Sequence, residues 1–127
     1  MATILDNGDV ILIQGDTLKY TITDIQVEDS ETNYNTYFAI YDEDRNPMIN
    51  EVQSVILNGI STFVIPHTET DKLVVPVNDE SKDYYFGIKL VNTTNNYEET
   101  LQIGTSTYGD LNVITVYPRR VIGLTNG

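Results

Sequence analysis

Hydrophobic and polar residues alternate along much of this chain. Residues 18–22, with the sequence LKYTI, are apolar at every second position, and residues 84–91, YYFGIKLV, repeat the pattern. A period of two is typical of a β-strand with one buried face, so both segments are predicted strands. Runs rich in Thr, Val, Ile and Tyr predict further strands at 9–13, 36–42, 51–57, 60–66, 73–77, 97–103 and 111–117.

Turn signals separate these runs. Asn58-Gly59 lies between VQSVIL and ISTFVI and favours a type I′ turn, in which both central residues need a positive φ. Residues 51–66 are therefore a predicted β-hairpin. The polar clusters 42–47 and 92–96 are predicted to close two more strand pairs.

No stretch of ten residues carries an apolar stripe at helical spacing, which predicts a helix content under about 10%. Eight or nine short strands indicate an all-β fold, either an antiparallel sandwich or a barrel. The prediction is a single antiparallel β-sandwich with Greek-key or immunoglobulin-like connections, built as one domain over residues 1–127. The acidic segment 28–33 has little to bury and is predicted to be a mobile loop. The predicted core includes Phe38, Ile40, Ile56, Phe63, Ile65, Phe86, Ile88, Leu90, Leu101 and Ile103.

The chain is strongly acidic, with 19 Asp or Glu against 7 Lys or Arg and a formal net charge of -12. Because each phosphate contact needs a cation, this charge argues against a nucleic-acid partner and against an anionic membrane surface. No apolar run approaches the ~20 residues of a membrane span. The start MATILDNGD has neither a basic segment nor an apolar one, so we expect no secretory signal and synthesis in a cytoplasm.

Gly15-Asp16-Thr17 interrupts two predicted strands and raises the question of an anion or metal site. A phosphate loop needs several glycines, a Lys before Ser or Thr, and a following helix, whereas here one glycine precedes a strand. The favoured interpretation is structural: Gly15 relieves a bulge or kink where an early strand bends or crosses between sheets.

Asp42, Asp44 and Asn46 have the spacing that opens an EF-hand calcium loop. The rest of that pattern fails, because Pro47 stands where the loop needs Gly and Gln53 where it needs a bidentate Glu. We therefore interpret this cluster as a hairpin turn. No metal site and no cofactor site is predicted.

An enzyme is not expected either. The chain has no cysteine, and its one histidine, His67, follows Pro66 in a polar stretch and is predicted to be exposed. Acidic pairs such as Asp79-Glu80 and Glu98-Glu99 lie in turn-like segments, and a small sandwich without tryptophan offers a poor sugar-stacking cleft. No catalytic residue is assigned.

Nine tyrosines favour a binding role, because tyrosine gives a large contact area at low entropic cost. Five of them are predicted to lie on outward strand faces or in loops: Tyr34, Tyr37, Tyr41, Tyr85 and Tyr108. The alternative for any one of them is an ordinary position on a half-buried strand face.

Four segments, QGDTLKYTI, YFAIYDEDRNP, FVIPHTETDKL and DYYFGIKLVNTTNNYEETLQIGT, together resemble the small β-sandwich domains of tailed-phage virion proteins. The resemblance is to the N-terminal domain of phage baseplate upper proteins and to similar tail, neck or head-fibre modules. Its matching positions are Gly15-Asp16-Thr17, Thr70, Leu73, Tyr85-Phe86-Gly87-Ile88, Thr100-Leu101 and Gly104. Baseplate upper proteins continue into a long fibre-forming region, so a small accessory or connector protein is expected here.

The resemblance implies a non-enzymatic structural protein of a phage virion, made in the cytoplasm of the host bacterium and located in the tail, baseplate, neck or capsid. Its expected partners are other virion proteins and copies of itself in a homo-oligomer. The alternative is a glycan-binding or adhesin-type module acting alone. Two apolar terminal segments, Thr3-Ile4-Leu5 and Val121-Ile122-Gly123-Leu124, either mediate assembly or extend edge strands of the domain itself.

Overall fold

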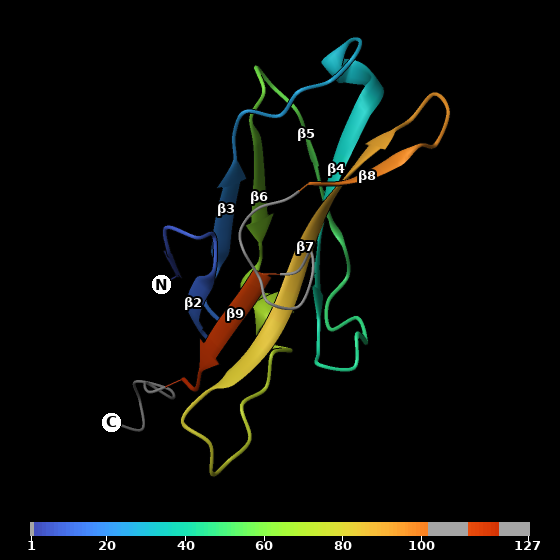
Figure 1. The fold of residues 1–127 in the computed structure, drawn as a ribbon. Helices are drawn as coiled ribbons and strands as arrows, with labels where there is room; N and C mark the ends of the chain where they lie inside the picture. Colours follow the sequence, from blue (N-terminus) through green and yellow to red (C-terminus); the bar gives the residue numbers. More distant parts are fainter. Residues whose placement is uncertain (1, 102–111, 120–127) are drawn as a thin grey trace.

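The computed structural model describes residues 2–101 and 112–119 (Figure 1). Of these residues, 48% lie in strands or bridges and 6% in helices, so the predicted all-β fold and low helix content are confirmed. The helical residues form η1 (Glu31–Asn33) and α1 (His67–Thr70). The strands are β1 (Thr3–Ile4), β2 (Val10–Ile13), β3 (Leu18–Ile22), β4 (Tyr34–Tyr41), β5 (Val52–Val55), β6 (Ser61–Ile65), β7 (Lys82–Asn92), β8 (Glu98–Leu101) and β9 (Asn112–Tyr117).

Seven strands form a large sheet around β7, the longest strand. Along one side, β7 pairs with the whole of β4, from Tyr34 opposite Asn92 to Tyr41 opposite Tyr85. Along its other side, β9 pairs with the first half of β7 and β8 with the second half. The order is β1-β2-β9-β7-β4-β5, with β8 beside β7.

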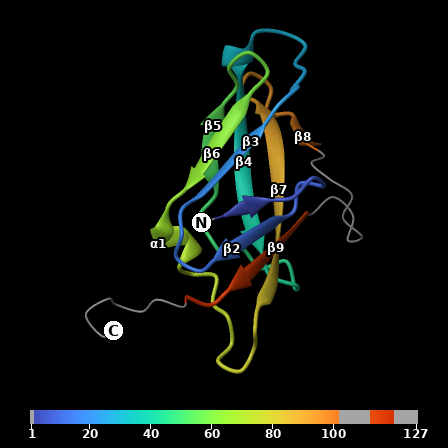
Figure 2. The same cartoon turned by 90° about the vertical axis from the view of Figure 1, so that its left-hand side faces the viewer.

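β3 and β6 form a separate two-stranded antiparallel sheet. Figure 2 shows these two strands in front of β4. In β3, Leu18 and Tyr20 are buried while Lys19 and Thr21 are exposed, as the alternation predicts. The buried side chains of both sheets join in one hydrophobic cluster, so the core lies between them.

Four aromatic rings lie at the centre of this core. Phe38 and Phe86, from the large sheet, stack with their centroids 5.0 Å apart. Tyr20, from the small sheet, meets the Phe86 ring edge-on at 5.2 Å, and Phe63 lies 5.5 Å from Phe38. The buried members of the predicted core are Phe38, Ile40, Ile56, Phe63, Ile65, Phe86, Ile88 and Leu90. Leu101 is partly buried, and Ile103 lies outside the described residues.

One strand pair is parallel, although the sequence predicted an antiparallel arrangement. β2 and β9 run in the same direction, and no turn joins them, so their direction is set by tertiary contacts. The Asn112 side chain donates hydrogen bonds to Asp9 Oδ1 (2.9 Å) and to the Asn7 carbonyl (3.1 Å). Asp9 Oδ1 also accepts from the Val113 amide (3.0 Å), which fixes the starts of the two strands side by side. The sandwich with Greek-key or immunoglobulin-like connections stays a prediction.

The Asn58-Gly59 turn forms as predicted. The φ angles are 54° at Asn58 and 75° at Gly59, and Leu57 and Ile60 exchange two backbone hydrogen bonds across the turn. Beyond it the two strands separate, because β5 enters the large sheet and β6 the small one. Residues 51–66 are therefore a sheet-to-sheet connection and not the continuous hairpin ladder that was predicted.

Side-chain hydroxyls connect the two sheets where backbone pairing stops. Ser61 Oγ donates to the Val55 carbonyl (2.8 Å), and Ser54 Oγ donates to the Thr62 carbonyl (2.7 Å). The fully buried hydroxyls of Thr36, in β4, and Ser61, in β6, also share a hydrogen bond. Buried polar groups need such partners, so these bonds favour one relative position of the sheets.

The acidic segment 28–33, predicted to be a mobile loop, contains η1 and is attached to the rest of the domain. The Glu31 carboxylate accepts hydrogen bonds from the backbone amides of Asn58 (3.0 Å) and Gly59 (2.8 Å). A carboxylate is a strong acceptor for such amides. The acidic residues that predicted a mobile loop therefore attach the segment to the β5–β6 turn, through the carboxylate of Glu31.

Residues 73–77 do not form the predicted strand. Leu73 and Val75 are buried in the core cluster, which accounts for the alternation that suggested a strand. The Tyr84 hydroxyl donates to the Val74 carbonyl (2.6 Å) between them. The segment therefore covers one end of the core by side-chain packing, without the backbone ladder of a strand.

The chain crosses from the large sheet to the small one at Gly15, between β2 and β3. Gly15 has a φ of 87°, and the Asp16 amide donates to the Ile13 carbonyl (3.0 Å). The prediction of a bend at a change of sheet is confirmed. A Cβ at this position would overlap the guanidinium of Arg119, which is ion-paired with Asp71 at 2.9 Å.

We expect Gly15→Val to lower the free energy of unfolding by about 1–3 kcal/mol, because a β-branched residue is strained at positive φ. Arg119→Ala should cost at most about 1 kcal/mol, since it removes an exposed ion pair. Denaturant unfolding of both variants and of the double variant measures the two effects. If Arg119→Ala restores the stability of Gly15→Val to that of Arg119→Ala alone, the overlap and not the backbone strain is responsible.

Candidate functional site

The outer face of the large sheet carries a group of tyrosines. Tyr37 and Tyr41 on β4 and Tyr85 on β7 alternate with core residues and are half-buried. Tyr41 lies opposite Tyr85. The two smallest residues of the face, Ala39 and Gly87, lie opposite each other between this pair and Tyr37. We call these five residues the tyrosine face. The small sheet packs on the opposite side of β4 and β7.

Lys89 lies at one end of the tyrosine face. Its ammonium group is 5.4 Å from the centre of the Tyr37 ring, 3.4 Å from Glu51 and 3.7 Å from Glu98. Partial burial acts to lower the pKa of Lys89, but the attraction of Glu51 and Glu98 outweighs it and raises that pKa above the usual value. The ammonium group therefore stays charged and orients the Tyr37 ring.

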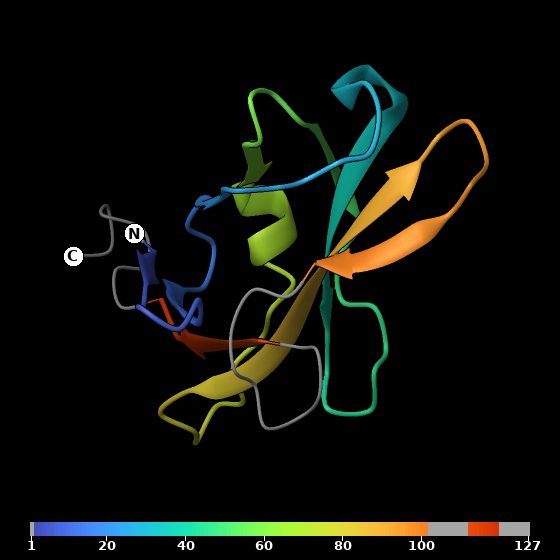
Figure 3. The same ribbon diagram turned by 45° about the horizontal axis from the view of Figure 1, so that its top comes forward.

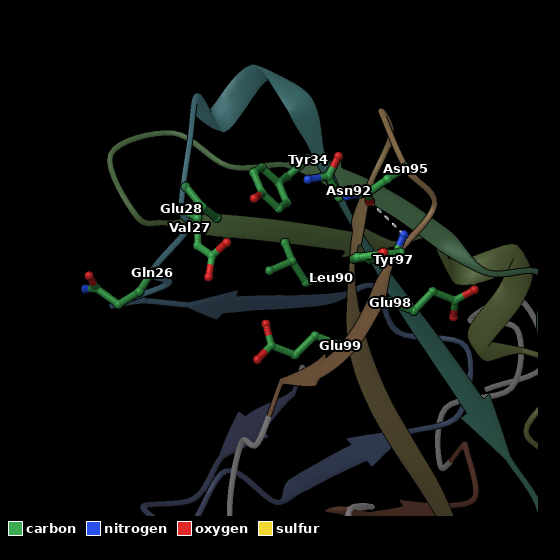
Figure 4. Close-up of a pocket in the computed structure, with 10 residues that line it drawn as sticks. All are labelled: Gln26, Val27, Glu28, Tyr34, Leu90, Asn92, Asn95, Tyr97, Glu98 and Glu99. Atoms are coloured by element: carbon green, nitrogen blue, oxygen red, sulfur yellow. Dashed lines mark hydrogen bonds between the residues drawn. The ribbon is translucent and has the colours of Figure 1, made fainter.

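A second surface is a groove of about 400 Å³ at the open side of the core. Figure 3 shows the β7–β8 hairpin projecting away from β3 and β6, which leaves this side uncovered by the small sheet. Figure 4 shows segment 26–28 on one side of the groove, residues 97–99 on the other, and Tyr34 and Leu90 between them. We call this the acidic groove. Its lining residues are Gln26, Val27, Glu28, Tyr34, Leu90, Asn92, Asn95, Tyr97, Glu98 and Glu99.

The floor of the acidic groove is apolar and its rim is polar. Leu90 and Tyr34 are buried together with Ile25 and Ile56 in a second hydrophobic cluster. Burial and a hydrogen bond to Asp29 raise the pKa of Tyr34, so its hydroxyl stays protonated. Tyr97, at the end of the β7–β8 turn, is 75% exposed. The groove thus combines an apolar base with an exposed aromatic ring.

The predicted tyrosine positions are partly correct. Tyr37, Tyr41 and Tyr85 lie on an outward face as expected, and Tyr108 lies outside the described residues. The prediction for Tyr34 is wrong, because its side chain points to the inner side of β4. Tyr97 was missed by the sequence analysis; its place after the Asn-rich turn 92–96 was the signal available for an exposed aromatic.

The Asp42 cluster is a turn, as predicted. Asp42 Oδ1 accepts hydrogen bonds from the amides of Asp44 (2.9 Å) and Asn46 (2.8 Å), and its Oδ2 accepts from Asn46 Nδ2 (3.1 Å). These bonds, from Asn46 above all, lower the pKa of Asp42. Tyr41 and Pro47 form a β-bridge across the turn. The Asp42 carboxylate, which would be the first ligand of a calcium loop, therefore already accepts hydrogen bonds from its own loop.

The other sequence candidates do not come together as a catalytic site. His67 is exposed at the start of α1, as predicted. Glu98 and Glu99 are neighbours on β8, so their side chains lie on opposite faces, and Glu98 approaches Lys89 while Glu99 lines the groove. Within residues 2–101 and 112–119, no three His, Asp or Glu side chains are grouped as metal ligands would be.

The two terminal segments have different outcomes. Thr3 and Ile4 form β1, which pairs with β2, so the expectation of an edge strand of the same domain is confirmed for this end. Ile4 and Leu5 nevertheless remain 44% and 42% exposed. Residues 121–124 lie outside the described residues.

Comparison of the sequence with protein-family models and with curated proteins found no match. Among the described residues, no helix has the length and hydrophobicity needed to cross a membrane.

The Asp42 hydrogen bonds predict a pH dependence of stability. Because the folded-state pKa lies below the ordinary value of 3.8, the stabilisation is fully present above that value and is lost as the pH falls through the lower folded-state pKa. We expect Asp42→Ala to flatten the decline of the unfolding free energy on acidification. Chemical unfolding between about pH 6 and pH 2 measures it. Asp44→Ala, which keeps the backbone donor, is the control, and an equal flattening there would contradict the assignment.

Proposed function

We propose that this protein is a non-enzymatic structural component of a phage virion, which binds other virion proteins or copies of itself through the tyrosine face. The observation that carries the proposal is this half-buried face of the central strands β4 and β7, with three tyrosines around Ala39 and Gly87. Tyrosine-rich surfaces with small residues between the rings suit a flat protein partner.

The surroundings of the tyrosine face agree with a protein partner. Val113 on β9 pairs with Tyr85, and Gln53 on β5 pairs with Tyr37, so both flank the face on neighbouring strands. Lys89 is neutralised by two glutamates, so the face carries little unpaired positive charge for an anionic ligand. The phage context comes from the sequence resemblance, and the tyrosine face supplies the contact surface such a component needs.

Association through this face should strengthen as salt rises. A protomer with a formal charge of -12 repels its copies at low ionic strength, and salt screens that repulsion without weakening apolar contacts. Sedimentation analysis at high protein concentration over a range of salt measures the association. We expect Tyr37→Ser combined with Tyr85→Ser to weaken it at least about tenfold, as removal of central interface tyrosines does.

Tyr97→Ser is the matched control, because Tyr97 is exposed but lies at the groove and not on the tyrosine face. Thermal unfolding of the variants checks that the fold is retained. Equal weakening by the control, or a monomer at every salt concentration that also fails to bind purified virion proteins, would contradict the proposal. Detection of the protein in purified phage particles tests the virion assignment independently.

A second candidate function, a glycan-binding module, is favoured by the acidic groove. It places the exposed ring of Tyr97 beside the amide side chains of Asn92 and Asn95, and such rings and amides are common contacts for sugars. A panel of neutral oligosaccharides tests this function. Saturable binding that Tyr97→Ala removes and Tyr85→Ala leaves intact would favour the glycan role over assembly, and absence of binding across the panel would reject it.

A further inference from the structure

The acidic groove lies beside an unpaired strand edge. β8 pairs with β7 on one side, and among the described residues no strand pairs with its other side. The Asn92 amide donates to the Tyr97 carbonyl at the turn (2.9 Å), and bonded and non-bonded pairs alternate along an antiparallel ladder. Glu98 and Thr100 therefore direct their backbone N–H and C=O groups away from β7. This edge can accept an added strand.

The opposite wall of the groove is a connecting segment. Residues 26–28 lie between β3 and η1 and belong to neither sheet. The segment is fixed at both ends, by the Ile25 amide on the Gly59 carbonyl (3.0 Å) and by Glu31 on the β5–β6 turn. A groove with two fixed walls is preformed, so an occupant does not have to order it.

The charge of the groove determines which kind of ligand it can bind. Of the ten residues that line it, three are glutamates and none is a lysine or arginine, and Glu28 and Glu99 are the two glutamates that are not paired with Lys89. The ammonium group of Lys89 is 3.7 Å from Glu98, and both lie on the outer face of the sheet. Tyr97 offers an exposed ring to a cation, and Leu90 offers an apolar base to its aliphatic stem.

We propose that the acidic groove binds an extended, basic segment of another protein, added as a strand along the free edge of β8. Backbone hydrogen bonds to Glu98 and Thr100 hold the segment, and every second side chain enters the groove toward Glu28 and Glu99. Basic residues at these alternate positions neutralise the glutamates. The proposal does not depend on the tyrosine face, which lies on the other side of the large sheet.

A capped octapeptide of alternating valine and lysine serves as the probe, and alternating valine and glutamate as its counterpart. We expect the lysine peptide to bind, with affinity falling as salt rises, and the glutamate peptide not to bind. This salt dependence is opposite to that expected for the tyrosine face, so the two proposals fail or succeed separately. In amide NMR spectra, the resonances of residues 26–28 and 97–100 should shift on titration.

Two variants of equal net charge test the location. Glu28→Gln with Glu99→Gln should weaken binding of the lysine peptide at least about tenfold, the scale of losing close charge pairs at an interface. Asp79→Asn with Glu80→Gln removes two exposed carboxylates outside the groove and should change the affinity for the lysine peptide less than about twofold. Equal weakening by both pairs, or equal binding of both peptides, would overturn the proposal.

Thr100→Pro tests strand addition, because proline removes an N–H on the free edge without removing a bond to β7. We expect it to abolish binding of the lysine peptide while the thermal midpoint changes by a few degrees at most. Retained binding in a folded Thr100→Pro variant would overturn the strand geometry. A neutral oligosaccharide that shifts the Tyr97 resonance, together with no response to the lysine peptide, would overturn the proposal and assign the groove to a glycan.

Discussion

The contact of four aromatic rings between the two sheets is the interaction on which the rest of the structure depends. β3 and β6 make a sheet of two strands, which is not stable alone in water. Tyr20 and Phe63 hold it against Phe38 and Phe86, and such ring pairs add roughly 0.5–1.5 kcal/mol each beyond their buried area. Two of the four crossings between the sheets, at Gly15 and at Asn58-Gly59, lead into β3 and β6, the strands that carry Tyr20 and Phe63.

The unequal size of the two sheets produces the two candidate surfaces. The small sheet covers only part of the inner side of the large one, so the β7–β8 hairpin extends beyond it and leaves the acidic groove (Figure 3). On the outer side, the tyrosines of β4 and β7 remain half-buried. The two surfaces lie on opposite sides of β7 and differ in charge, so the two proposed interactions can be tested separately.

Four of the acidic side chains have a structural role at loops and strand ends. Asp9, Glu31, Asp42 and Glu69 each accept a hydrogen bond from a backbone amide of a loop or strand end. Such amides lack partners in the ladders, and a carboxylate satisfies them better than a neutral group does. These four carboxylates fix connections, whereas Glu28 and Glu99 line the open surface of the groove.

The sequence by itself determined most of the strands, the turns at Gly15 and Asn58-Gly59, and most of the core. Alternation with a period of two requires one buried face, and Gly15 and Asn58-Gly59 are residue types that tolerate positive φ, so these features follow from local chemistry. Tertiary structure alone decided that β2 and β9 are parallel, that β5 and β6 belong to different sheets, and that Tyr34 faces inward while Tyr97 borders a groove. Alternation shows that one face of a strand is buried. It does not show which strand pairs with it or how far the second sheet covers it, because pairing and coverage depend on contacts between residues far apart in the chain.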